Sequence, residues 1–240
     1  MSDAAAVLRA LHHGRAPGDP LVLPGPWDAA SARVFADAGF PALATPSAGV
    51  SASLGYEDGH TPAGEMFEAV FRIVRAVDVP VTADIEDGYG LPARELVERL
   101  LATGAAGCNL EDSDRVTKRL RDPAEQADRL AEVREAAGDA LVVNARVDTY
   151  LRGDRTLGAA VERARLYVAA GADCVYPILA PPEQLGPIAE AVGAPVNALC
   201  KAGGPAPREL GVFGATRVTF GGGLHTQALD AVRRLAEGLA

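Results

Sequence analysis

Eight short apolar segments alternate with stretches of helical period along almost the whole chain, and this alternation limits the fold more than any other feature. The apolar segments are 21–24, 41–45, 80–84, 107–111, 141–145, 173–177, 195–198 and 216–220. Between them, segments such as 65–77 repeat apolar residues at the spacing of one helix face. Each strand and helix together form a βα unit, and repeated βα units build a parallel sheet.

Eight such units predict a (β/α)8 TIM-type barrel that occupies residues 1–240 as a single domain. The chain has 240 residues, which suits one barrel of about 250 residues. Five glycines stand where a helix ends before the next strand, a place that favours a left-handed residue. They are Gly39, Gly104, Gly171, Gly193 and Gly214.

Composition and charge narrow the classes of protein. Hydrophobic residues make up 48% of the chain, but no apolar run approaches the roughly 20 residues of a membrane span. The first twenty residues lack the pattern of a signal peptide, so we expect a cytoplasmic protein. A formal net charge of -9 without a basic stripe predicts no nucleic-acid partner and no membrane partner. Cys108, Cys174 and Cys200 are widely spaced and suit reduced core thiols.

Three acidic residues lie where apolar strand segments stop. Asp84 and Glu86 follow the third segment, and Glu111 ends the fourth. Alternation along a strand predicts that Asp84 and Glu86 point the same way, whereas Asp87 belongs to a solvated turn. Neighbouring carboxylates repel one another unless a cation neutralises them, and oxygen ligands suit a divalent ion. These three carboxylates therefore predict a metal site.

Function in such a barrel gathers at the carboxyl ends of the strands. Arg146 follows the fifth segment and is the one cation that the strand pattern directs toward the carboxylates. Arginine suits two-pronged binding of a carboxylate or phosphonate, so Arg146 is a candidate for substrate binding. An ion pair with Asp148 or Glu111 is the alternative, and both roles can coexist.

The motifs of the chain resemble those of the isocitrate lyase / phosphoenolpyruvate mutase superfamily. The resemblance covers PWDAASARVFADAGF (26–40), SAGVSASLGYEDG (47–59), TADIEDGYG (82–90), GCNLEDS (107–113) and NARVDTYL (144–151). It implies a Mg²⁺-dependent barrel, with Mn²⁺ as a possible substitute, that acts on a small carboxylate substrate such as a 2-oxo acid or its enolate.

The resemblance also implies roles for single residues. Asp84 would bind the metal directly, while Glu86 and Glu111 would hold it directly or through water. Asp58 would orient the water shell of the metal or the reacting group, and Arg146 would bind the substrate carboxylate. Further substrate contacts would come from Thr45, Ser47 and Ala48, and from Asn197 after the seventh strand.

Two departures from the lyase pattern leave the reaction open. The loop 112–122 contains neither the Cys nor the His that the lyases carry there, and Ile178 stands where they place a Glu. Lys118 is the candidate acid or base of this loop, which we expect to be a mobile lid with a solvated Arg121. A lyase that breaks a C–C or C–P bond through an enolate, a hydrolase of the phosphonopyruvate or oxaloacetate type, and a non-catalytic 2-oxo-acid-binding barrel all remain.

The resemblance bears on assembly as well. Superfamily members usually exchange a C-terminal helix between neighbours, but little of this chain follows the amphipathic stretch 226–239, which is interpreted as the eighth barrel helix. This stretch either closes its own barrel or itself crosses to a partner, and the short turn 221–224 limits how far it can reach. We expect a homo-oligomer, a dimer or tetramer held by helix faces. Of the histidines, His12 is expected to be exposed and His225 to have no role. Trp27 is expected to pack at the barrel rim.

Overall fold

A computed structural model describes residues 4–239 of the chain. Eight strands lie within or beside the expected segments: β1 (Leu21–Val22), β2 (Leu43–Ala44), β3 (Val81–Asp84), β4 (Gly107–Glu111), β5 (Val142–Val147), β6 (Cys174–Pro177), β7 (Asn197–Leu199) and β8 (Arg217–Thr219). The helices are α1 (Ala4–Leu11), α2 (Ala29–Asp37), α3 (Ser47–Leu54), α4 (Ala63–Val74), α5 (Ala93–Thr103), α6 (Pro123–Ala137), α7 (Thr149–Arg152), α8 (Leu157–Ala169), α9 (Pro182–Val192), α10 (Pro207–Val212) and α11 (Gly223–Glu237).

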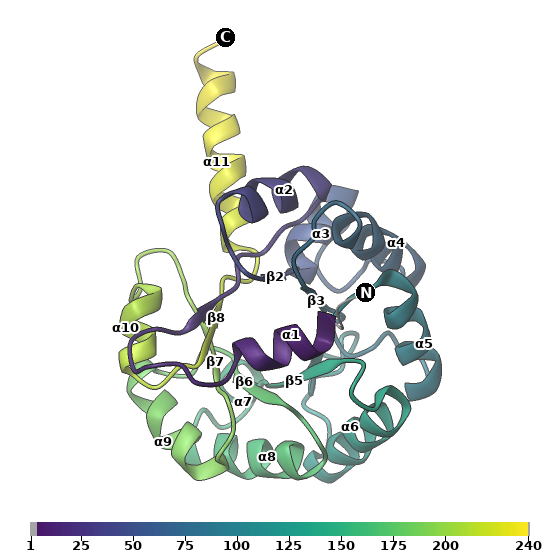
Figure 1. Cartoon of the computed structure of the whole chain (residues 1–240), viewed down its shortest axis with the longest axis vertical. Helices are drawn as coiled ribbons and strands as arrows, with labels where there is room; N and C mark the ends of the chain where they lie inside the picture. The colour runs from purple at the N-terminus through teal and green to yellow at the C-terminus, as the bar shows by residue number, and fades with distance from the viewer. Residues whose placement is uncertain (1–3, 240) are drawn as a thin grey trace.

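The strands form a parallel barrel surrounded by helices, as Figure 1 shows. Strands β2 to β6 pair in chain order, and β1, β8 and β7 form a second parallel run. A bridge between Val175 and Val196 joins β6 to β7, and the amide of Ala44 donates to the carbonyl of Pro24 over 3.1 Å beside β1 and β2. The TIM-type barrel predicted from the alternation is therefore confirmed.

Local sequence explains where the helices begin, end and face. The carboxylate of Asp122 accepts from the amides of Ala124 and Glu125 ahead of α6, whose first residue is Pro123. Helix α5 ends at Gly104, which has a left-handed φ of 78°. The buried residues of α4 include Met66, Val70 and Ile73, spaced as one helix face. Hydrophobic packing of such faces holds the helices against the barrel.

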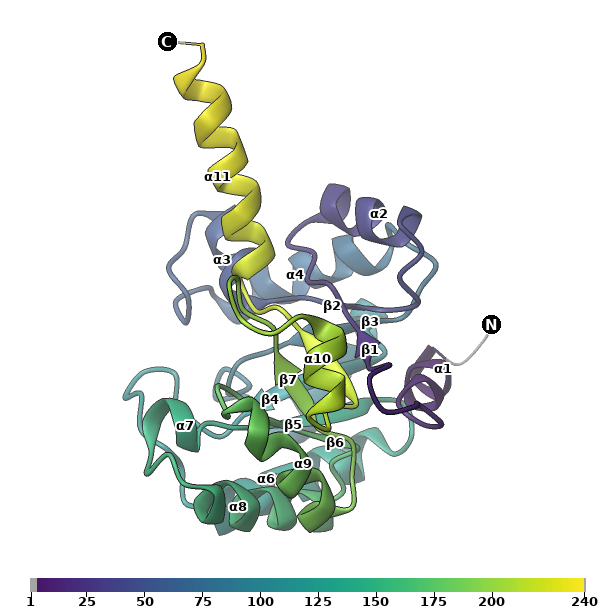
Figure 2. The same cartoon turned by 90° about the vertical axis from the view of Figure 1, so that its left-hand side faces the viewer.

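Helix α1 lies across the amino-terminal end of the barrel (Figures 1 and 2). Leu8 is fully buried there, and His12 is only 3% exposed, so the expectation that His12 is exposed is wrong. The ring Nδ1 of His12 lies 2.8 Å from the carbonyl of Leu8. Burial, with a smaller contribution from Arg217, lowers the pKa of His12 to about 4. The sequence could not show this because the contact depends on how α1 folds back.

Helix α11 does not complete the barrel of its own chain. Figures 1 and 2 show it projecting away from the rest of the molecule. Its apolar residues Leu229, Val232 and Leu235 are exposed by 40%, 58% and 69%. The interpretation of 226–239 as a packed eighth barrel helix is therefore wrong, because the chain turns outward at α11.

Two of the three cysteines and Trp27 lie where the sequence analysis expected them. All three cysteines are free, and Cys108 and Cys174 are buried. Trp27 packs edge-on against Phe35 and His225 at the rim. Within residues 4–239, no helix has the length and hydropathy needed to cross a membrane.

Candidate active site

A cavity of about 390 Å³ opens at the carboxyl ends of the strands, where a barrel carries its functional residues. Most of the residues singled out from the sequence line it. They are Thr45, Ser47, Ala48, Asp58, Asp84, Glu86, Glu111, Lys118 and Arg146. The barrel thus brings together side chains that are as many as 101 positions apart, from Thr45 to Arg146.

Asp84 ends β3 and is held by the loop after β2. Its Oδ2 accepts from the hydroxyl of Ser47 over 3.2 Å, and its own amide donates to the hydroxyl of Thr45 over 3.2 Å. The Ser47 hydroxyl also lies 3.4 Å from Oδ1 of Asp58. Burial raises the pKa of Asp84, and Arg146 opposes that rise. Ser47 therefore links Asp84, the expected metal ligand, to Asp58, which was expected to orient the water shell of the metal or the reacting group.

Glu86 is the least satisfied polar side chain of the cavity. It is 3% exposed, yet neither carboxylate oxygen has a hydrogen-bond partner among the described residues. Burial, followed by repulsion from Asp84 and Asp58, raises the pKa of Glu86 to about 7. Its backbone is left-handed, with a φ of 51°. Strand alternation therefore ends at Asp84, although both side chains still line the cavity as expected.

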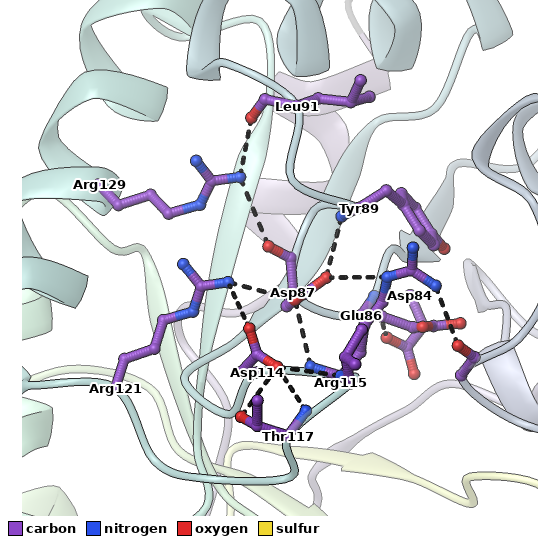
Figure 3. Close-up of polar contacts among 12 residues, drawn as sticks. Asp84, Glu86, Asp87, Tyr89, Leu91, Asp114, Arg115, Thr117, Arg121 and Arg129 are labelled. Atoms are coloured by element: carbon purple, nitrogen blue, oxygen red, sulfur yellow. Dashed lines mark hydrogen bonds and ion pairs between the residues drawn. The ribbon is translucent and has the colours of Figure 1, made fainter.

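Asp87 is buried rather than part of a solvated turn, which corrects the sequence expectation. The left-handed backbone at Glu86 turns Asp87 away from solvent, and Figure 3 shows it between Arg115 and Arg121. Its Oδ1 accepts from the amide of Tyr89 over 2.9 Å, and its Oδ2 accepts from Arg121 and from the amide of Arg115, each over 3.2 Å. Asp87 therefore anchors the loop that follows β4.

Arg146 lies in the middle of a buried ion-pair network. It contacts Glu111 on one side and Asp148 on the other, where its Nε donates to Oδ1 over 2.6 Å. Burial alone would lower the pKa of Arg146, but these two carboxylates outweigh it and raise the pKa above its ordinary value. Arg146 is consequently a permanent cation with a fixed orientation. The ion pairs expected as an alternative are both present, and the side chain still lines the cavity.

Asn197 does not reach the cavity, so its predicted contact with substrate is not supported. It begins β7 instead of following it, and its side chain is fully buried. Its amide donates to the hydroxyl of Thr219 over 2.9 Å, and Thr219 in turn lines the cavity. Asn197 thus belongs to a buried polar layer at the cavity floor, together with Asn109, which lines the cavity and whose side-chain oxygen accepts from Arg217 over 3.2 Å.

The loop 112–122 is more ordered than its charge density predicts. The carboxylate of Asp114 accepts from the amides of Val116 and Thr117, and a bridge pairs Ser113 with Leu120. Arg121 is not a solvated residue, because it is paired with Asp87. The sequence could not show the pairing with Asp87, because Asp87 lies on a different loop, the one that follows β3.

Two cations of this loop face the segment that carries Asp58. Nη1 of Arg115 donates to the carbonyl of Gly59 over 3.0 Å. A methyl group added at Gly59 would lie 2.9 Å from Nζ of Lys118. The loop after β4 therefore covers the cavity from the β2 side. Arg115 was not among the predicted site residues, and the only sequence signal for it was its place in this charged loop.

The comparisons with known proteins agree with this geometry. The family model for phosphoenolpyruvate phosphomutase matches residues 8–240. A 2-methylisocitrate lyase of Halalkalibacterium halodurans is 30% identical over 88% of this chain and 70% of its own length. A crystal structure of 2,3-dimethylmalate lyase superposes with a TM-score of 0.87 at 29% identity, covering 100% of this chain and 88% of that one.

An uncharacterized protein of Mycobacterium tuberculosis is also similar, with 34% identity over 96% of this chain and 87% of its own length. The matched region of the family model contains every residue that lines the cavity. The chain therefore belongs to the phosphoenolpyruvate phosphomutase family, within the isocitrate lyase / phosphoenolpyruvate mutase superfamily.

Proposed function

We propose that the protein is a Mg²⁺-dependent lyase that breaks a C–C or C–P bond of a small 2-oxo acid or related carboxylate through an enolate. The observation that carries this proposal is the set of buried carboxylates around Arg146, in which both oxygens of Glu86 lack a partner in the described part of the chain. A buried carboxylate without a partner is costly, and a cation offsets that cost. The named relatives of the chain include lyases.

Asp84 would hold the metal directly, and Glu86 and Glu111 would hold it directly or through water. Within residues 4–239, no three Asp, Glu, His or Cys side chains converge closely enough to hold one ion together. This arrangement fits Mg²⁺, which keeps several waters and needs only one or two protein carboxylates. When bound, the ion would polarise the ketone of a 2-oxo acid and stabilise negative charge on its oxygen.

The substrate carboxylate would pair with Arg146, whose orientation is already fixed by Glu111 and Asp148. Preset orientation lowers the entropy cost of binding. The loop from Thr45 to Ala48 would contact the same end of the substrate, with Ser47 keeping Asp84 in place. Lys118 would act as the acid or base that donates a proton to C3 of the substrate or accepts one from it, because its amine faces the cavity from the loop after β4.

NMR of the protein with Mg²⁺ and a panel of oxaloacetate, phosphonopyruvate, 2-methylisocitrate and 2,3-dimethylmalate tests the proposal. New product signals that require both Mg²⁺ and an intact Arg146 support a lyase. If the products instead arise by attack of water, as oxalate from oxaloacetate or pyruvate with phosphate from phosphonopyruvate, they support a hydrolase. Saturable binding without turnover would support a non-catalytic 2-oxo-acid-binding barrel, an alternative favoured by the loop 112–122, which has no Cys or His. Absence of both binding and turnover would overturn the proposal.

We also propose that the protein forms a homo-oligomer, a dimer or tetramer, in which α11 packs on a second copy. The exposed apolar side of α11, with Leu229, Val232 and Leu235, supports this arrangement. Light scattering on a chain truncated before Thr226 provides the test. We expect the truncated protein to lose association. A folded truncated protein that associates like the parent would show that α11 takes no part in the interface.

A further inference from the structure

The acidic and apolar linings of the cavity lie on opposite sides of the barrel. Every acidic residue that lines it comes from the strands and loops of β2 to β5. The lining from β6 onward contains no acid, and it includes the apolar residues Ile178, Leu199 and Phe220 beside the polar residues Tyr176, Lys201 and Thr219. In a barrel of eight strands, β7 faces β3 across the axis, so Leu199 is opposite Asp84. A ligand that binds at Asp84 and Arg146 therefore directs its other end toward an apolar wall.

A second cavity of about 290 Å³ lies immediately behind that wall, between the loops that follow β6 and β7. Its lining is apolar apart from Lys201 and Gly204, and it includes Pro177, Leu179, Leu185, Pro205 and Leu210. Leu199 and Lys201 line both cavities. Ile178 faces the first cavity, while its neighbours Pro177 and Leu179 face the second. The two cavities are therefore adjacent and share part of their lining.

The walls of the second cavity are rigid. Leu179 has a left-handed φ of 64°, which is unfavourable for leucine and persists only where the surroundings impose it. The amide of Ala180 donates to the carbonyl of Pro177 over 3.0 Å, and α9 begins at Pro182 after Pro181. Prolines fix the backbone on both sides of this turn. A preformed apolar cavity binds a hydrocarbon group without first paying an ordering cost.

Lys201 gives this cavity a polar rim on the side of the active site. It is exposed, and its amine has no hydrogen bond or ion pair with the described residues. A lysine can line an apolar surface with its methylenes while its amine stays at the polar boundary. Its position suits a ligand whose acid group lies in the first cavity and whose hydrocarbon part enters the second.

We propose that the second cavity binds a hydrocarbon substituent on C3 of the substrate, so that the preferred 2-oxo acid or related carboxylate carries a chain longer than a methyl group. This inference rests on the proposed function, because that function places the acid end of the substrate at Asp84 and Arg146. It makes Ile178, Leu199 and Lys201 specificity-determining residues. The class of ligand is an acid with a flexible apolar tail.

Calorimetric titration of the full chain in Mg²⁺ with pyruvate, 2-oxobutanoate, 2-oxopentanoate and 2-oxohexanoate tests this inference. We expect affinity to rise about four-fold for each added carbon, the ratio that corresponds to ~0.8 kcal/mol per buried CH₂. Ala180→Phe fills the second cavity, so it should flatten the dependence on chain length and leave pyruvate binding unchanged. Ala136→Phe, at an exposed position of α6, is the matched control and should behave like the parent.

The outcomes separate this inference from the proposed function. If pyruvate binds but affinity does not change with chain length in the parent protein, the second cavity takes no substituent and the inference is wrong. A steep dependence that survives Ala180→Phe would place the tail elsewhere and also overturn it. If none of the four acids binds, the proposed function is wrong. The inference about the second cavity then fails with it, because it requires a substrate whose acid group lies in the first cavity.

Discussion

Glu86 and Asp87 are consecutive acidic residues, both buried, yet their surroundings are opposite. Asp87 has donors for both oxygens, from Tyr89, Arg115 and Arg121. Glu86 has none among the described residues and faces the cavity. A fully partnered carboxylate holds two loops together, whereas an unpartnered one is costly as an anion unless a ligand supplies the missing positive charge or the carboxyl takes up a proton. Both side chains are buried, so their hydrogen bonding, more than their burial, distinguishes a residue that holds the site together from a residue that binds a ligand there.

The largest effect that we expect is the loss of metal binding when a carboxylate that faces the cavity is replaced. Asp84→Ala should remove measurable Mg²⁺ binding and leave the fold intact, because a charge at the barrel mouth contributes to function more than to packing. Isothermal titration measures the binding, and circular dichroism during heating monitors the fold. Mg²⁺ binding by Asp84→Ala as tight as that of the parent would show that the proposed ligand set is wrong.

Asp87→Ala should have the opposite profile. It removes the carboxylate partner of Arg115 and the nearer of the two carboxylate partners of Arg121, and breaking a buried ion pair from one side costs about 3 kcal/mol. Urea denaturation of the metal-free protein measures that loss. Asp128→Ala on the exposed side of α6 is a control that should cost little. A loss below about 0.5 kcal/mol for Asp87→Ala would remove the distinction between the two neighbours.

His12 is an exception to this rule, because its Nε2 has no partner among residues 4–239 although the side chain lies at the amino-terminal end of the barrel, away from the cavity. Burial lowers the pKa of His12 from 6.5 to about 4, so the unfolded chain binds the extra proton between those values. Stability should therefore fall as pH drops below about 6.5, by about 2 kcal/mol at pH 5. Denaturation of the parent and of His12→Gln across this range measures it. Equal slopes in the two proteins would contradict the prediction.

Glu86→Gln should change stability in the favourable direction. At pH 8 the metal-free parent must hold a buried charge whose pKa is raised to about 7, and glutamine removes that charge. We expect a gain of about 1 kcal/mol at pH 8, after allowing for solvent screening in the open cavity, and almost no gain at pH 4, where the carboxyl is protonated in both the folded and the unfolded chain. Urea denaturation at the two pH values measures it. A loss of stability at pH 8 would mean that Glu86 has a partner in solution.

The smallest expected effect concerns the loop 112–122. The backbone turns of this loop and its contact with Asp87 should partly protect its amides from hydrogen exchange even without ligand. Exchange should slow further when Mg²⁺ and a saturating concentration of the 2-oxo-acid ligand are present. The segment 157–169, on α8, serves as the internal reference. Equal exchange with and without ligand would contradict the lid prediction and leave Lys118 as an ordinary surface residue.

The sequence predicted the strands and most cavity residues because both depend on local pattern. Strand alternation and the position of a residue just after an apolar segment placed Asp84, Glu111 and Arg146 at the mouth. Asn197 shows the limit of this reasoning. The strand expected at 195–198 begins two residues later in the structure, at Asn197. The side chain of Asn197 is therefore buried inside the barrel and does not follow the strand at the mouth.

Other features lay beyond the sequence because they depend on distant segments or on a single backbone angle. The left-handed backbone of Glu86 decides where Asp87 points, and no composition signal marks a glutamate for that conformation. The ion pair between Asp87 and Arg121 joins loops 34 positions apart. His12 became buried only when α1 folded across the barrel end. Each of these errors came from treating a charged or polar residue outside a strand as solvated.

The outward course of α11 has a thermodynamic consequence. Its apolar side, which includes Val232 and Leu235, can leave water only by contact with another molecule, since its own barrel does not cover it. If α11 packs on a second copy, as proposed, burial of that side is governed by mass action, and each ten-fold dilution of a dimer lowers the stability of the assembled state by ~1.4 kcal/mol. We then expect the melting temperature to rise with protein concentration, so that concentration itself becomes a determinant of stability.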